Sequence, residues 1–147
     1  MKRFQFSLQK LLNLREFREK QAEIELGKAN AARDAVQLDL ESVAQKRVTA
    51  AFERGGSASV QDLLAIERYI ARLDAKKEKL IEDLAACELV VERTRGVYLE
   101  ATKDRQIISK LREKKEASWR RKYLSDEAAV LDDIVNARGN SASASGQ

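Results

Sequence analysis

Apolar residues recur at alternating steps of three and four through residues 63–108, and this spacing constrains the fold more than any other feature. The positions are Leu63, Ile66, Ile70, Leu73, Lys77, Leu80, Leu84, Cys87, Val91, Thr94, Tyr98, Ala101, Arg105 and Ile108. A 3.5-residue repeat of about six heptads keeps one seam of a helix against a partner helix, as in left-handed coiled coils. We therefore expect an all-α fold.

A weaker copy of the repeat precedes it. Its positions are Ala22, Leu26, Ala29, Arg33, Val36, Leu40, Val43, Arg47 and Ala50, and a second stripe of Leu14, Phe17, Ile24, Ala31, Ala35 and Leu38 runs beside them. The chain has no proline, and 35% of its residues are charged but only 5% aromatic. This composition is typical of long helices and too poor in large side chains for a thick core.

The one turn-like cluster ahead of the C-terminal tail is residues 54–59, which contain Gly55 and Gly56. Ser59 can cap a following helix, with Asp62 three positions on as in a capping box. A short glycine turn between two long helices makes them antiparallel neighbours. The sequence therefore predicts a long antiparallel two-helix coiled-coil hairpin.

The expected boundaries follow from these signals. They are a helix at about 7–54, a turn at about 55–59 and a helix at about 60–137, forming a single hairpin domain over 1–137, with a disordered tail at 138–147. A turn centred near residue 56 places Leu40 opposite Leu73 and Val43 opposite Ile70. The second helix would then overhang the first by about 30 residues at its C-terminal end.

The expected overhang is strongly basic. Residues 103–122 hold nine basic and three acidic residues, a net charge of +6 against +4 for the whole chain. An apolar stripe of Leu124, Ala128, Leu131 and Val135 follows it. We interpret this region as a docking segment with basic sides and apolar anchors, since aromatic residues such as Trp119 are enriched at the hot spots of protein interfaces. The alternative is a solvated basic helix whose apolar residues fold back or dimerise.

Several functions find no support in the residues. There is no histidine, and the single cysteine, Cys87, falls on the seam, which favours a buried structural role over a reactive one. We expect no enzyme activity, no metal and no cofactor. No apolar run is long enough for a signal peptide or a membrane span. Glu113 and Glu116 interrupt the basic segment and argue against nucleic acid, whereas a membrane-surface helix stays open.

The ordered set of motifs resembles the FliJ family of flagellar export proteins. Residues 4–16 resemble the family's opening Phe-x-Phe-x-Leu-x-x-Leu-Leu pattern, and Tyr69-Ile70-x-x-Leu73 resembles a short motif early in its second helix. Residues 110–121, with Leu131 and Asp132, resemble its charged C-terminal region. The match covers nearly the whole chain.

The resemblance implies a component of the flagellar type III export apparatus, similar to the central stalk of rotary ATP synthases. Family members insert into the ring of the export ATPase FliI, contact the export-gate protein FlhA and help to recycle export chaperones. The expected location is the cytoplasm, peripheral at the cytoplasmic face of the inner membrane at the flagellar base. Alone, the protein is expected to be monomeric.

The resemblance also implies two sets of contact residues. The ATPase ring would meet Leu8, Leu11, Arg105, Arg112, Lys114, Lys115 and Trp119, and the gate would meet Val43, Tyr69, Leu73 and Leu80. Lys46 and Ala50 stand where relatives can carry aromatic residues. A structural coiled-coil tether or homo-oligomeric spacer is the alternative function, distinguishable because a spacer would sediment as a stable dimer.

Overall fold

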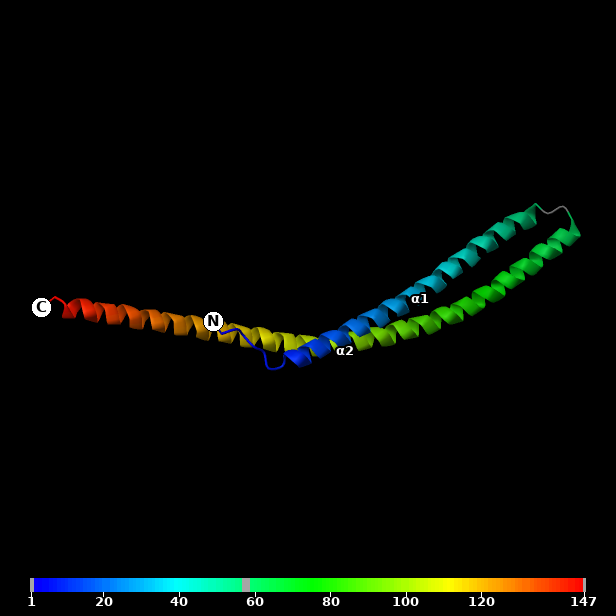
Figure 1. The fold of residues 1–147 in the computed structure, drawn as a ribbon. Helices are drawn as coiled ribbons and strands as arrows, with labels where there is room; N and C mark the ends of the chain where they lie inside the picture. Colours follow the sequence, from blue (N-terminus) through cyan, green and yellow to red (C-terminus); the bar gives the residue numbers. More distant parts are fainter. Residues whose placement is uncertain (1, 57–58, 147) are drawn as a thin grey trace. The chain divides into compact units, whose positions relative to one another are not determined.

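The computed structural model describes residues 2–56 and 59–146, which form two helices, α1 (Gln9–Gly55) and α2 (Val60–Ala144) (Figure 1). The helices pack antiparallel as a hairpin, so the predicted all-α fold is confirmed. Residues Ser57 and Ala58 of the expected turn lie outside the described residues.

The start of α2 is set by a side-chain cap. The backbone N–H of Asp62 donates a hydrogen bond of 3.1 Å to Ser59 Oγ, and the N–H of Leu63 donates to the Ser59 carbonyl at 3.1 Å. The predicted N-cap is thus confirmed. Helix α1 begins close to the expected position, after a turn in which the N–H of Gln9 donates to the Phe6 carbonyl at 3.1 Å.

Helix α2 continues to Ala144, past the expected end near Ala137. Residues 138–144 are therefore helical in the structure, where the sequence analysis expected a disordered tail. Within these residues, Ser141 and Ser143 each donate a side-chain hydrogen bond of 2.9 Å to a backbone carbonyl three residues earlier. The expectation of a disordered tail rested on the glycine- and serine-rich composition of these residues, which does not by itself end a helix.

The chain divides into two compact units, which we describe separately. Unit 1 comprises residues 1–17 and 103–147, and unit 2 comprises residues 18–102. The expectation of one hairpin domain over 1–137 stays a prediction.

The core of unit 2 is the predicted seam. Its buried residues are Ala22, Ala29, Val43, Ala50, Ile70, Leu73, Leu80 and Val91, every one of them at a heptad position. The second stripe of α1 is exposed instead, with Ile24 at 41% and Leu38 at 64%. One helix partner covers only one stripe, so the seam alone is buried.

Two ion pairs define how α1 and α2 align in unit 2. Arg47 Nε lies 2.7 Å from Asp74 Oδ1, and Arg54 Nη1 lies 2.8 Å from Glu67 Oε1. In both pairs, the α2 residue that lies opposite the α1 residue is about one heptad closer to the C-terminus than the expected register predicts. Arg47 donates the hydrogen bond that lowers the pKa of Asp74, and the same bond raises the pKa of Arg47.

The buried cluster agrees with the shifted register. Val43 packs with Leu73 and Leu80, and Leu40 lies against this cluster, whereas the expected partner of Val43 was Ile70. The expected pairing was therefore wrong by about one heptad. A shift of seven residues leaves the same positions in the seam and changes only their partners, so periodicity cannot detect it.

In unit 1, the residues before α1 and its first turns pack on α2. Phe6, Leu12 and Ile108 are buried together, and Phe4, Leu11 and Leu111 pack against them. The Arg15 guanidinium donates a hydrogen bond of 2.7 Å to the backbone carbonyl of Asp104. Beyond Tyr123, every described residue of α2 is exposed.

Candidate partner-binding surfaces

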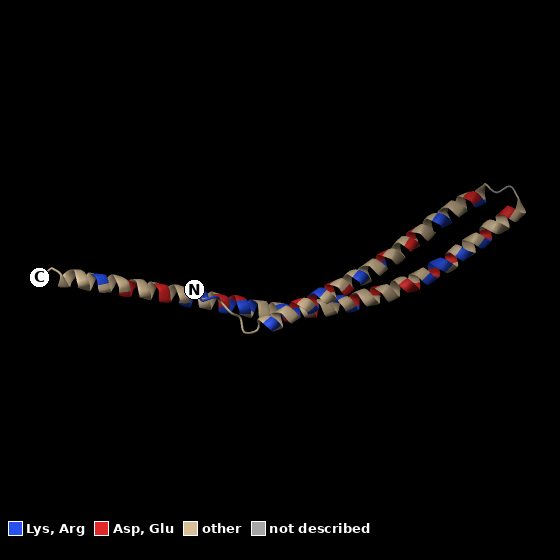
Figure 2. Ribbon diagram, in the orientation of Figure 1, with Lys and Arg blue, Asp and Glu red and all other residues tan. Residues whose placement is uncertain are grey.

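The basic segment of α2 exposes only part of its charge. Lys114 and Lys115 are exposed, whereas Arg105 and Arg112 are half-buried. Figure 2 shows that basic and acidic residues occur along both helices. The Nε of Arg112 is buried without a hydrogen-bond partner among the described residues. A buried N–H without an acceptor is unfavourable, so an acceptor supplied by a partner would stabilise it. The lysine ammonium groups are available as point charges.

Two predicted contact residues lie near the start of α1, Leu8 just before it and Leu11 in its first turn. Leu8 is 36% exposed, and Leu11 is half-buried against the cluster of Phe6, Leu12 and Ile108. The structure therefore brings Leu11 to the same unit as the basic segment. Leu8 presents more of its side chain to solvent than Leu11 does.

Trp119 is part of an aromatic row. Its ring stacks on Tyr123 at a centroid distance of 5.4 Å and an interplanar angle of 14°, and Phe4 lies tilted against it at 6.0 Å. Tyr123 also bonds to Glu127, which raises the pKa of the phenol. The i, i+4 spacing on a helix brings Trp119 and Tyr123 together. The contact with Phe4 was missed, because only the packing of the N-terminal segment creates it.

The four residues expected at the gate differ in exposure. Val43, Leu73 and Leu80 are buried at 2%, 6% and 8%, so they hold the hairpin together. Tyr69 is 37% exposed, and the Arg72 guanidinium lies 5.9 Å from the centre of its ring. Tyr69 is therefore the member of this set whose side chain can meet a partner in the closed hairpin. The assignment of all four to the gate stays a prediction.

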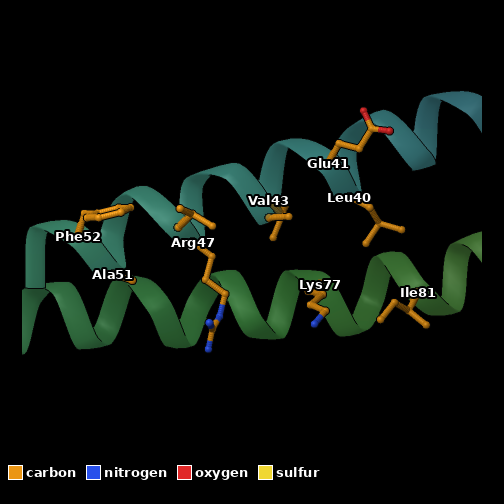
Figure 3. A pocket seen from close by; sticks show the side chains of 10 residues that line it. Leu40, Glu41, Val43, Arg47, Ala51, Phe52, Lys77 and Ile81 are labelled. Carbon is orange, nitrogen blue, oxygen red and sulfur yellow. The ribbon is translucent and has the colours of Figure 1, made fainter.

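A groove near the turn was not predicted from the sequence. It has a volume of about 770 Å³ and lies between α1 and α2, with Arg47 reaching from α1 toward α2 (Figure 3). Its apolar walls include Val48 at 52% exposure, Phe52 at 79% and Ile81 at 45%. Phe52 is separated from Phe17, Ile24 and Leu38 by multiples of seven residues, so it lies on the same face of α1. This spacing was the sequence signal that could have predicted the groove.

The described residues include no group of three or more histidine, cysteine, aspartate or glutamate side chains that could hold a metal ion. Cys87 is half-buried at its seam position. Within residues 2–56 and 59–146, neither helix has a stretch long and apolar enough to cross a bilayer.

Together these features define a protein of two long helices packed as an antiparallel hairpin, with charged and apolar side chains exposed along open helix faces. Residues 4–143 match the family model described as Flagellar FliJ protein. The chain therefore belongs to the FliJ family, a non-catalytic component of the flagellar export apparatus, which confirms the resemblance seen in its motifs. Searches of curated proteins and of solved structures found no match.

Proposed function

We propose that this protein binds the export ATPase FliI as a central stalk, stimulates its hydrolysis, and links it to the export gate FlhA and to export chaperones. Membership of the FliJ family supports this role. The single observation that carries the ATPase contact is unit 1, where the basic segment and the start of α1 pack together. Leu8, Leu11, Arg105, Arg112, Lys114, Lys115 and Trp119 all belong to this unit.

The chemistry of this surface suits an acidic ring. Lys114 and Lys115 add charge at the surface, which speeds encounter with a negative partner. Arg112 supplies a buried N–H that still needs an acceptor. Leu8 offers an exposed apolar contact beside Leu11. The protein would work at the cytoplasmic face of the inner membrane, at the flagellar base.

The gate contact belongs to unit 2. Tyr69 contributes an exposed aromatic ring, whereas Val43, Leu73 and Leu80 are buried together in the seam of the same unit. The groove beside Phe52 lies in the same unit and offers further apolar area. Aromatic side chains with part of their surface exposed are favoured anchors in protein interfaces.

The test is stimulation of purified FliI. A variant with Arg112→Glu, Lys114→Glu and Lys115→Glu should raise the concentration needed for half-maximal stimulation by about tenfold, because three favourable charge contacts become repulsive. Unchanged stimulation would overturn the proposed ATPase contact.

The matched control makes the same charge change in unit 2. Arg68→Glu, Lys76→Glu and Lys79→Glu replace three exposed basic residues. This variant should stimulate FliI as the original protein does. If both variants lose stimulation equally, net charge and not the unit 1 surface is responsible.

A further inference from the structure

One face of α2 in unit 1 carries a row of basic residues of which only Lys114 belongs to the proposed ATPase contact. Lys103, Lys110, Lys114 and Arg121 follow one another at steps of seven, four and seven, which places them on one face of the helix. All four are exposed. At 1.5 Å per residue, the row is about 27 Å long. We call these four residues the basic stripe.

In the part of the chain that the structure describes, the basic side chains of the stripe are not held in ion pairs. None of its residues forms an ion pair among the residues that the structure describes, whereas nearby Arg120 lies 3.9 Å from Glu116. The positions between them on the same face are small or apolar, including Ala117 and Ile107, the latter 62% exposed. The stripe therefore presents four separated positive charges on one exposed face of α2.

The opposite face of the same segment is occupied by packing. Ile108 is buried with Phe6, and Trp119 contacts Phe4 and Tyr123. The N-terminal segment therefore covers one side of α2 and leaves the basic stripe turned to solvent. Lys2 and Arg3, both exposed, precede Phe4 and add two positive charges to this unit.

We propose that the basic stripe binds the surface of an anionic phospholipid bilayer. Rows of four to eight lysine and arginine residues on a helix are attracted to acidic headgroups, and each basic residue adds to the attraction within a screening length of about 8 Å. Exposed Ile107 would enter the headgroup boundary between the lysines, whose long stems let the ammonium groups reach phosphate.

The composition of the stripe favours lipid over protein and nucleic acid. Three of its four members are lysine, a residue depleted in protein interfaces, and no aromatic anchor lies among them. Nucleic-acid binders carry denser basic blocks than this segment, in which Glu113 and Glu116 occupy the flanks. A row of separated point charges fits a surface of mobile headgroups, which can rearrange to meet each ammonium group.

The test uses the full chain and sedimentation with vesicles. The protein should pellet with vesicles of phosphatidylcholine rich in phosphatidylglycerol and stay in solution with pure phosphatidylcholine. Lys103→Glu, Lys110→Glu and Arg121→Glu together should lower the partition coefficient at least tenfold. Raising the salt to about 1 M, where the screening length falls to about 3 Å, should release the original protein.

The same control variant applies here. Arg68→Glu, Lys76→Glu and Lys79→Glu should keep vesicle binding, and helical content should be equal in all variants by circular dichroism. Three results would overturn the proposal: no pelleting with anionic vesicles, equal pelleting with neutral ones, or full binding by the stripe variant. Binding to duplex DNA or to an acidic protein in place of vesicles would also overturn it.

The inference goes beyond the export role and can fail separately from it. The stripe variant spares every residue assigned to the ATPase ring, since Lys114 is left unchanged. It should therefore lose vesicle binding while stimulating FliI more strongly than the variant with Arg112→Glu, Lys114→Glu and Lys115→Glu does. Loss of FliI stimulation with intact vesicle binding would overturn the stripe as a lipid site and leave the ATPase contact standing.

Discussion

Replacing Leu73 by alanine separates the structural role of the seam from direct partner contact. Leu73 is 6% exposed and packs with Val43 and Leu80, so the substitution removes buried methyl groups and leaves a cavity. Such changes lower the free energy of unfolding by about 2–4 kcal/mol. The control, Leu38→Ala, removes a side chain that is 64% exposed and should cost within about 0.5 kcal/mol.

Urea unfolding followed by circular dichroism measures both variants, with binding to FlhA measured beside it. Leu73→Ala should lose stability, and any loss of gate binding should follow from that loss. Tyr69→Ala changes a side chain that is 37% exposed and should weaken gate binding with less loss of stability. The seam assignment is refuted if Leu73→Ala and Leu38→Ala prove equally stable.

The remaining predictions concern the register and acidity of unit 2. In a chain with Cys87→Ala, a short bis-maleimide should cross-link Arg47→Cys to Asp74→Cys, because the side chains at these positions meet. It should not cross-link Arg47→Cys to Glu67→Cys. The reverse result on a denaturing gel would restore the register first expected. The hydrogen bond from Arg47 holds the pKa of Asp74 below its ordinary value of 3.8. Because the folded pKa is depressed, the stabilisation is present above 3.8 and is lost as the pH falls through the folded value. Asp74→Asn should remove that dependence in low-salt unfolding measurements, and identical acid profiles would contradict the assigned bond.

The seam was predictable because burial in a two-helix coiled coil depends on spacing alone. Every buried residue of unit 2 stands at a position that the three-and-four steps select, including alanines such as Ala29 and Ala50 that carry little hydrophobic signal by themselves. The N-cap at Ser59 was predictable for a similar reason, since capping involves only neighbouring residues.

The register was not predictable, because the repeat is indifferent to a shift of one heptad. Only the pairing of particular charges, such as Arg47 with Asp74, distinguishes one alignment from the next. The gate residues are a different case, because their assignment came from the resemblance and not from the repeat. Periodicity identified Leu73 and Leu80 as apolar, and the resemblance assigned them to a contact surface, but the seam buries both.

Contacts made by residues outside the helices could not be predicted from the periodicity either. Phe4 lies ahead of α1, and no period relates it to Trp119 far along the chain. The groove beside Phe52 was missed because the second stripe of the first helix was followed only as far as Leu38.

The aromatic row has a practical consequence, since Trp119 is the sole tryptophan of the chain. Its emission therefore comes from one place, with Phe4 on one side and Tyr123 on the other. The protein carries an intrinsic optical reporter of whether its N-terminal segment is seated. Fusion tags at that end would disturb the reporter, so a label-free titration is best read from a chain whose first residues are unmodified.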